Sequence, residues 1–270
     1  MRTINSIFSK SGYSIARNET VKRAASYPFL KDSFLRTLRD YETVLRTTIF
    51  PELPATEKRH ELMLELIGNP LIEAFYILNF LHLSLAVEGD VCEFGVAEGT
   101  NSALMANELL RSSRSLWLFD SFEGLPKPTE KDRMLDDIFD LGDMASYEGK
   151  MAHPQSRVKA RLEAVGFPQT RTKIVPGFIE KVPEKAYPDK VCFAYVDFDF
   201  YEPIKIALER LHTRTAPGAY VVVDDYGFFS EGAEVAVTEF LAAHSDAYET
   251  ISPEPHAKGF MALKKLSTGR

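Results

Sequence analysis

Two acidic stretches follow apolar runs in the second half of the chain. Asp197 and Asp199 stand one residue apart in "YVDFDFYEP", and Asp224 and Asp225 are adjacent in "VVVDDYG". Carboxylates at the ends of two buried strands lose hydration and repel one another, so a compensating charge is needed. Oxygen ligands without His or Cys partners suit Mg²⁺, which keeps its remaining positions for water or substrate. The two stretches therefore predict a magnesium site.

Each acidic pair taken alone would also fit a solvated turn at a strand end. Neighbouring strands lie ~4.8 Å apart, so acidic residues that end two such strands can converge. Alternation along "FAYVDFDFY" places Asp197 and Asp199 on the same side if the strand continues. Two pairs on consecutive strands favour a shared metal site over two separate turns.

A glycine-containing turn precedes the acidic stretches, in "EFGVAEGTNS" from Glu93 to Ser102. Gly95 and Gly99 have the spacing G-x-x-x-G, and the G-x-G-x-x-G that lets a backbone approach a pyrophosphate is missing. Such a turn still brings backbone N–H groups to a helix N-terminus, where they suit a carboxylate. S-adenosylmethionine, with a carboxylate and a ribose but no phosphate, fits this turn. A turn without any ligand is the alternative.

An acidic residue closes the next predicted strand, in "LWLFDSFEGLP". Asp120 lies 25 positions after Gly95, near the spacing at which a carboxylate meets the ribose hydroxyls of a nucleoside. The alternative is that Asp120 caps the following element. We favour ribose binding. The predicted cofactor-binding residues are Glu93, Phe94, Gly95, Glu98, Gly99, Thr100, Asn101, Ser102, Asp120, Ser121 and Phe122.

The elements that must position these residues alternate between strands and helices. From Asp90 onward, short β-rich runs such as "VCEFGV", "SLWLFD", "CFAYVDF" and "AYVVVDDY" are separated by helical ones. This alternation predicts parallel βαβ units in a doubly wound α/β sheet. "YETISPEPHAKGFMALKK" predicts an antiparallel hairpin at one edge. Ligands bind such sheets outside the carboxyl ends of the strands, where every motif above is located.

The segment before the sheet is predicted to be helical. Residues 1–59 are interpreted as an N-terminal helical cap or lid, and residues 60–270 as the α/β domain. Helical spacing runs from about Leu30 to Leu45. "EKRHELMLELI" and "PLIEAFYILNFLHLSLAVEG" predict two more helices, of which the second is apolar nearly all round and so packed on both sides.

Composition excludes several kinds of partner. The chain has 270 residues, 45% hydrophobic and 26% charged, and a net charge of −7. This acidity argues against nucleic acid, because phosphate contacts are made mostly by Lys and Arg. No segment resembles a signal peptide or reaches the ~18 apolar residues of a membrane span. Cys92 and Cys192 fit buried core positions. We expect a soluble, cytoplasmic protein with a small-molecule partner, and a homo-oligomer because the N-terminal helices are apolar.

The four motifs together resemble one known family. "CEFGVAEGTNS", "LFDSFEGLP", "YVDFDFYEP" and "VVVDDYG" are similar to the TylF-type macrocin O-methyltransferases, magnesium-dependent enzymes that methylate sugar hydroxyls on macrolide and aminocoumarin antibiotics. The resemblance covers about residues 60–265 and implies a class I, Rossmann-like methyltransferase domain. It also implies metal ligands at Asp197, Asp224 and Asp225, and a general base at Asp199.

Two positions depart from the family pattern. Phe198 stands where the family usually has the glycine of D-G-D, so a large ring lies beside the predicted metal. Ala97 and Glu98 replace residues that are often aromatic or basic in the cofactor turn. Neither change removes a predicted ligand, and both bear on the identity of the acceptor.

The predicted chemistry is methyl transfer to a sugar hydroxyl. Such a hydroxyl is a weak nucleophile, and a bound cation lowers the pKa of a coordinated oxygen, here of two adjacent acceptor hydroxyls. Asp199 would take the proton as general base. The loop from Lys127 to His153 and the N-terminal helices would cover the acceptor. Predicted acceptor contacts are Tyr201, Tyr226 and His153.

Other classes of protein compete with this interpretation. A catechol-type O-methyltransferase acting on a small diol uses an Asp-Asn pair for its metal, and Asp225 in the Asn position favours the sugar enzymes. A non-catalytic methyltransferase-like binding module would have little reason to bury four like charges. A phosphoacceptor receiver domain carries its acidic pair after the first strand, where this chain has a glycine turn.

Overall fold

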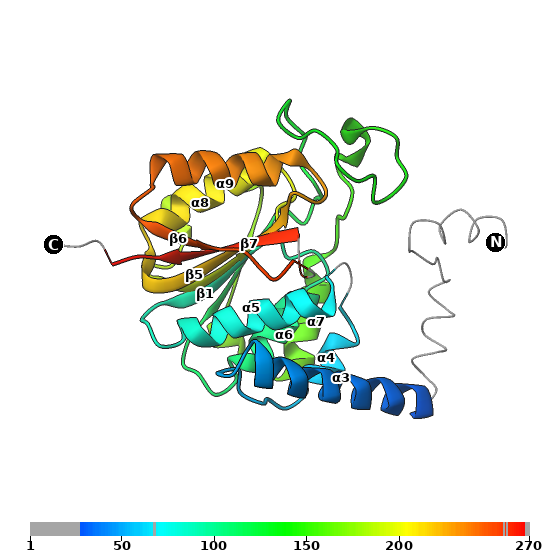
Figure 1. Cartoon of the computed structure of the whole chain (residues 1–270). Helices are drawn as coiled ribbons and strands as arrows, with labels where there is room; N and C mark the ends of the chain where they lie inside the picture. Colours follow the sequence, from blue (N-terminus) through cyan, green and yellow to red (C-terminus); the bar gives the residue numbers. More distant parts are fainter. Residues whose placement is uncertain (1–27, 67–68, 256, 258, 268–270) are drawn as a thin grey trace. The chain divides into compact units, whose positions relative to one another are not determined.

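The computed structural model describes residues 28–66, 69–255, 257 and 259–267 (Figure 1). Contacts divide the chain into two units, residues 1–51 and 52–270. The first unit contains helix α3, Pro28–Thr48, which includes the predicted helical stretch. Residues 1–27 of the predicted cap lie outside the described residues. The division between cap and methyltransferase domain at residue 59 stays a prediction.

The second unit is built on a seven-stranded sheet with the order β3-β2-β1-β4-β5-β7-β6. Strands β1 to β5 run parallel, and β7 runs antiparallel to both β5 and β6. The strands are β1 Asp90–Phe94, β2 Leu116–Asp120, β3 Thr172–Pro176, β4 Val191–Val196, β5 Thr215–Tyr226, β6 Tyr248–Ile251 and β7 Gly259–Lys265. The predicted doubly wound sheet with an antiparallel C-terminal hairpin is confirmed. Its strand order reverses between β1 and β4, where a ligand crevice is expected.

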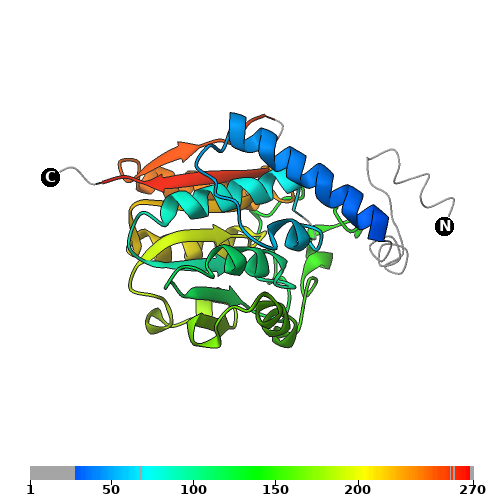
Figure 2. The same ribbon diagram turned by 90° about the horizontal axis from the view of Figure 1, so that it is seen from below.

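Helices cover both faces of this sheet (Figure 1). Helices α8 and α9 lie on one face, and α4, α5, α6 and α7 lie on the other, which Figure 2 shows from below. Their bounds are α4 Arg59–Met63, α5 Leu71–Ser84, α6 Thr100–Glu108, α7 Gln155–Val165, α8 Tyr201–His212 and α9 Glu231–Ala243. The connections also hold short 3-10 turns, Met144–Tyr147, Gln169–Arg171, Ile179–Lys181 and Glu184–Ala186.

Two of the predicted helices differ in outcome. Helix α5 is buried at ten of its fourteen residues and contacts β4, β5 and α6, so the predicted packing on both sides is confirmed. Helix α4 spans only five residues, shorter than its apolar pattern predicts. Lys58, at its start, has a left-handed backbone with φ 61° and no capping side chain.

The central strands form the core beneath the site. Every residue of β4 is buried, as expected for a parallel strand with helices on both faces. Phe94 of β1 stacks on Phe119 of β2 with ring centroids 4.6 Å apart. Cys92 and Cys192 are buried free thiols, in agreement with their predicted core positions. Among the described residues, no helix is long and apolar enough to cross a membrane. The predicted homo-oligomer stays a prediction.

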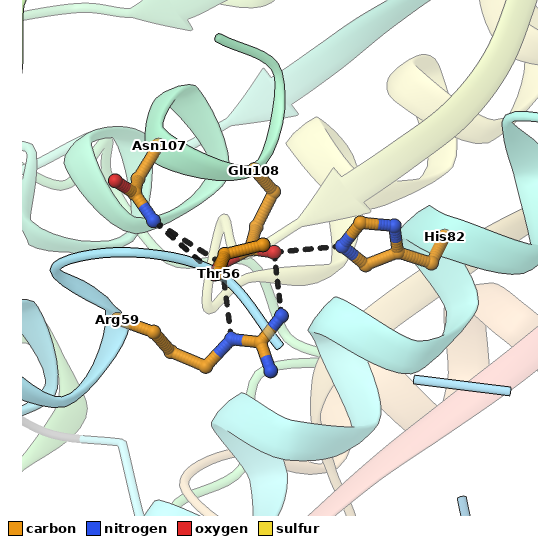
Figure 3. Close-up of polar contacts among 5 residues, drawn as sticks. All are labelled: Thr56, Arg59, His82, Asn107 and Glu108. Carbon is orange, nitrogen blue, oxygen red and sulfur yellow. Dashed lines mark hydrogen bonds and ion pairs between the residues drawn. The ribbon is translucent and has the colours of Figure 1, made fainter. Parts of the chain in front are cut away.

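A buried polar cluster joins the segment before α5 to helices α5 and α6 (Figure 3). Glu108, at the end of α6, accepts hydrogen bonds from Arg59 Nη2 at 2.6 Å and Thr56 Oγ1 at 2.6 Å. Its Oε2 lies 2.7 Å from His82 Nε2, and Asn107 Nδ2 donates to Thr56 at 3.4 Å. The side chains of Arg59 and Glu108 are fully buried, so this ion pair is shielded from water.

Candidate active site

Three carboxylates converge at the carboxyl ends of β4 and β5. Asp197, Asp199 and Asp225 each offer an oxygen, and these oxygens all lie within 4.8 Å of one another. The sheet register explains the convergence, because Val196 pairs with Val223 immediately before the two acidic stretches. The structure therefore brings the two stretches together, as the sequence predicts.

Asp224 lies outside this group of three, and it is buried whereas the other three aspartates are half-buried. Only 8% of Asp224 is exposed, and its Oδ2 accepts a hydrogen bond from the Tyr195 hydroxyl at 2.5 Å. Its Oδ1 accepts from the backbone N–H of Asp225 at 2.8 Å. Asp199, which is predicted to be the general base, thus belongs to the group of three. Asp224, which is predicted to be a metal ligand, lies outside this group and is more deeply buried. The division of roles between Asp199 and Asp224 stays a prediction.

Two of these three aspartates have unusual backbone conformations. Asp199 has φ 62° and Asp225 has φ 56°, in the left-handed region that Asp tolerates better than most residues. The Ser230 hydroxyl donates to the carbonyl of Asp199 at 2.9 Å and holds the first turn in place. Left-handed residues of this kind cluster at ligand sites, where the surrounding fold offsets the local strain.

The carboxylates of the acidic group repel one another. Burial, followed by the charges of Asp224 and Asp225, raises the pKa of Asp197 well above its usual range. Burial and the charges of Asp199 and Asp224 do the same to the pKa of Asp225. In the part of the chain that the structure describes, no Lys, Arg or His forms an ion pair with any of the four aspartates. An oxygen-only set of repelling carboxylates fits a divalent cation such as Mg²⁺.

A further carboxylate, buried on helix α5, lies beside the four aspartates. Glu73 is 4% exposed, and its Oε1 lies 3.5 Å from the Tyr195 hydroxyl. Burial and the charge of Asp224 raise the pKa of Glu73 well above its usual range. The sequence motifs do not predict Glu73. The signal in the sequence was a single carboxylate in the otherwise apolar run "PLIEAFYILNF". Because burying a carboxylate costs free energy, such a residue is expected to have a specific partner or role.

The glycine turn lies directly against the first acidic stretch. Gly95 has φ 85°, and a Cβ on it would overlap the carbonyl oxygen of Asp197. Only glycine lets the turn after β1 approach the backbone after β4 so closely. Gly99 has φ 78° and precedes α6 as its N-cap, against Val158. The predicted cofactor turn and the predicted metal site are therefore adjacent.

Asp120 holds the glycine turn through backbone contacts. Its Oδ2 accepts from the N–H groups of Val96 at 2.7 Å and Ala97 at 3.0 Å, and its Oδ1 accepts from Phe122 at 2.6 Å. Phe122 has φ 56°, uncommon for a bulky residue, and the Ser121 hydroxyl donates to the Gly124 carbonyl at 2.9 Å. One carboxylate thus fixes both the turn after β1 and the turn after β2. The ribose contact of Asp120 stays a prediction.

Most of the other predicted cofactor residues are buried. Glu93 is 1% exposed and accepts a short hydrogen bond from the Ser102 hydroxyl. Burial raises the pKa of Glu93 to about 8, so this side chain is mostly neutral at pH 7. The Phe94 ring is buried in the sheet core, which leaves its backbone to line the turn. Thr100 and Asn101 lie buried in the first turn of α6.

Glu98 connects the cofactor turn to helix α7. Its carboxylate forms an ion pair with Arg157 and accepts from Arg161 Nη2 at 3.5 Å. His153, predicted to contact the acceptor, has its Nδ1 3.6 Å from Glu98 Oε1. The structure thus places His153 beside a predicted cofactor residue. Its acceptor contact stays a prediction.

The two predicted acceptor tyrosines differ in their surroundings. Tyr201 is 5% exposed, and its hydroxyl donates to Glu239 Oε2 at 2.6 Å. Lys131 lies over the Tyr201 ring at 4.0 Å from its centroid, so this tyrosine holds α8, α9 and the loop together. Tyr226 is half-buried at the end of β5, next to the acidic group. Their contacts with an acceptor stay predictions.

The loop predicted over residues 127–153 is packed beside the acidic group. Asp132 Oδ1 accepts from the backbone N–H of Tyr201 at 2.6 Å, and the N–H of Leu135 donates to the carbonyl of Phe229 at 3.0 Å. A small core of Leu125, Tyr147, Phe200 and Phe229 lies beneath it. Several large apolar side chains at this end remain exposed, namely Leu135 (48%), Ile138 (38%), Phe139 (49%) and Phe228 (43%).

Solved structures share this fold. The O-methyltransferase NovP superposes with a TM-score of 0.61 at 22% identity, covering 87% of this chain and 99% of that protein. The calicheamicin methyltransferase CalS11 gives a TM-score of 0.58 at 22% identity, covering 88% of this chain and 93% of that protein. The fold is therefore that of the class I methyltransferases, as predicted.

The chain belongs to the macrocin O-methyltransferase (TylF) family, whose model matches residues 78–250. It is 32% identical over 148 residues to an 8-demethyl-8-(2,3-dimethoxy-alpha-L-rhamnosyl)-tetracenomycin-C 4'-O-methyltransferase of Streptomyces olivaceus, covering 53% of this chain and 55% of that protein. It is 27% identical to a mycinamicin III 3''-O-methyltransferase of Micromonospora griseorubida, covering 61% and 65%. The chain thus spans less than two thirds of the length of these relatives. The predicted family resemblance is confirmed.

Proposed function

We propose that this protein is a magnesium-dependent, S-adenosylmethionine-dependent O-methyltransferase that methylates a sugar hydroxyl of a glycosylated natural product. The observation that carries the proposal is the close approach of the Gly95 turn to Asp197. In this arrangement a cofactor-type turn and a group of carboxylates lie side by side at the switch point of the sheet. The relatives named for methylation of glycosylated antibiotics support the same reaction.

Residues already described would hold the cofactor and the metal ion. The turn from Glu93 to Ser102, together with Asp120, would hold S-adenosylmethionine, which supplies an activated methyl group. Asp197, Asp224 and Asp225 would hold Mg²⁺, which when bound lowers the pKa of an acceptor hydroxyl. Asp224 would bind the ion through an oxygen that also accepts a hydrogen bond, since its Oδ2 accepts from Tyr195 and its Oδ1 from the backbone N–H of Asp225.

The chain's own residues then position the acceptor and take its proton. Asp199 stands within the carboxylate group, and its oxygen would accept the proton of the hydroxyl as methyl transfer proceeds. The turn at Gly95 and the turn at Asp199 would hold the methyl donor and the hydroxyl in line. The packed loop over residues 127–153 would exclude water from one side.

The surroundings of the acidic group favour a large, uncharged acceptor. Phe228 is linked to Asp225 by a backbone hydrogen bond at 3.1 Å, and Leu135 to Phe229 by one at 3.0 Å. Phe139 stacks on Tyr147, which itself contacts Phe229. Exposed apolar side chains therefore ring Phe229 beside the site, where the body of a glycoside would rest. A small diol, the catechol-type alternative, would leave this surface unused.

Calorimetric titration tests the proposed function. S-adenosylmethionine and Mg²⁺ are titrated into the wild type, Asp199→Ala, Asp224→Ala and the control Asp246→Ala, whose aspartate is exposed away from the site. We expect all four proteins to bind the cofactor, and only Asp224→Ala to lose Mg²⁺ binding. Asp199→Ala should lower kcat on a glycosylated acceptor by about 10²–10⁴-fold. A wild type that binds neither ligand would overturn the proposal.

A further inference from the structure

Asn69 forms a bridge between the cofactor turn and the acidic group. Its Oδ1 accepts from Asn101 Nδ2 at 2.7 Å, and Asn101 stands in the first turn of α6 directly after the cofactor turn. Its Nδ2 donates toward Tyr195 Oη at 2.9 Å, Glu73 Oε1 at 3.1 Å and Asp224 Oδ2 at 3.2 Å. One amide group therefore contacts both halves of the site.

The hydrogen bonding at both ends of this bridge is incomplete. The Asn69 amide nitrogen has two hydrogens but three acceptors within reach, so it cannot bond all of them at once. At the other end, the Oδ1 of Asn101 is buried, with only 8% of Asn101 exposed, and it has no hydrogen-bond partner among the residues that the structure describes. A buried acceptor without a partner is destabilising, and a donor on a bound molecule would relieve that cost.

Tyr195 connects Asn69 to two predicted metal ligands, Asp197 and Asp224. Its hydroxyl is completely buried and contacts Asp224 Oδ2 at 2.5 Å and Asp197 Oδ2 at 3.2 Å. A phenol donates only one hydrogen, so an N–H from Asn69 that occupies its lone pair favours donation to a carboxylate. The orientation of the Asn69 amide thereby decides how the Asp224 carboxylate is held.

We propose that Asn69 is a positioning residue that couples occupancy of the cofactor site to occupancy of the cation site. The proposal rests on the proposed function, because it takes the two ligands from it. The ammonium group of S-adenosylmethionine, or of its demethylated product, supplies a donor for the orphan oxygen of Asn101. This donor would fix the Asn101 amide, and so favour the orientation of Asn69 in which its N–H groups donate to Tyr195 and Asp224. By linkage, each ligand strengthens binding of the other by the same factor.

The test measures that coupling factor by calorimetry. MgCl₂ is titrated into the full-length wild type in the absence and presence of saturating S-adenosylhomocysteine, which carries the ammonium group but cannot react. The same titrations are made with Asn69→Ala and with Asn107→Ala, a control that removes another buried amide of the α6 region. We expect the ligand to tighten Mg²⁺ binding at least about fivefold in the wild type and in Asn107→Ala. In Asn69→Ala the factor should fall to about one.

Each outcome bears on the proposal. A merely structural role for Asn69 would weaken both ligands and leave the coupling factor unchanged, which would overturn it. A wild type that binds both ligands independently would also overturn it, while leaving the proposed function intact. A wild type that binds neither would instead contradict the proposed function. If Asn69→Ala does not fold, Tyr195→Phe retains the ring, removes the hydroxyl and should abolish the coupling.

Discussion

At the scale of single residues, the site depends on a few side chains that must be small, neutral or strained. Gly95 must lack a side chain because its turn lies against the Asp197 backbone. Glu93 carries a carboxyl that burial keeps mostly neutral, and Asp199 and Asp225 adopt left-handed backbones. None of these properties is visible in the residue type alone.

Gly95→Ala tests the close approach of the two turns. Gly142 is a matched control, since its φ of 87° resembles the 85° of Gly95 but a Cβ there meets nothing within 4 Å. Gly142→Ala should cost about 1–2 kcal/mol for its left-handed backbone. Gly95→Ala pays that cost and also forces the two backbones apart, so its free energy of unfolding should fall further, by several kcal/mol. Equal losses in urea denaturation would contradict the close approach.

Glu93→Gln tests the neutral state of the buried carboxyl. The folded pKa of about 8 exceeds the unfolded value, so the folded state holds an extra proton between them. Wild-type stability should therefore fall as pH rises from about 5 to 8, by up to about 1.4 kcal/mol per pH unit, and level off above that. Glu93→Gln should flatten this slope in denaturation series, whereas the exposed control Glu123→Gln should keep it.

At the scale of elements, a buried ion pair fixes the segment that leads to the site. Arg59 of α4 and Glu108 of α6 are both fully buried, and Asn69 follows α4 by only a few residues. Burial alone would raise the pKa of Glu108, but hydrogen bonds from His82 and Arg59 outweigh it and lower that pKa to about 2. The cluster in Figure 3 thus anchors the chain just before its bridge to the site.

Glu108→Ala tests this anchor. The change removes the buried carboxylate that pairs with Arg59, and because breaking a buried ion pair from one side is costly, we expect a loss of about 3–5 kcal/mol in the free energy of unfolding. The control is Glu57→Ala, which breaks an ion pair between two exposed side chains, Glu57 and Arg111, and should cost less than about 1 kcal/mol. Similar losses for both variants would show that the buried pair does not anchor the segment.

The same pair predicts a pH dependence. Because the folded pKa of Glu108 lies below its unfolded value, its stabilisation is fully present above about pH 5. It should be lost progressively as pH falls from about 4 towards 2. Acid unfolding followed by circular dichroism should show this loss in the wild type, and Glu108→Gln should lack that contribution. An unchanged acid transition in Glu108→Gln would contradict the lowered pKa.

At the scale of the whole molecule, the sheet concentrates negative charge at one point of an already acidic protein. The chain carries a net charge of −7, and the group of aspartates has no basic partner among the described residues. Folding therefore works against the repulsion of this group, and a bound cation would remove that cost. Stability and ligand occupancy should be linked.

Asp225→Asn tests this linkage, because Asn also tolerates the left-handed backbone of Asp225. Without Mg²⁺, the variant should melt at a higher temperature than the wild type, since one repelling charge is gone. At free Mg²⁺ about 100 times Kd, the wild type should gain about 2.7 kcal/mol, and the variant little. Calorimetric melting measures both effects, with Asp246→Asn as the exposed control. A variant less stable than the metal-free wild type would show that repulsion is not the dominant effect.

The sequence by itself determined the features that depend on local pattern. Alternating strand and helix patterns predict the sheet, apolar runs predict its buried strands, and turns with Gly or Asp at strand ends predict where ligands bind. The acidic stretches around Asp197 and Asp224 and the turn at Gly95 follow from this logic, because parallel strands bring their carboxyl ends to one edge.

Only the tertiary structure decided which side chains meet. Asn69 reaches Tyr195 across 126 positions of sequence, and Tyr195 donates a hydrogen bond to Asp224, which lies outside the group that Asp199 joins. Glu73 lies on helix α5, and the apolar pattern of that helix does not indicate that Glu73 lies near the site. The physical reason is that periodicity fixes which face of an element is buried. Which residues of other elements share that face depends on the packing of the whole domain.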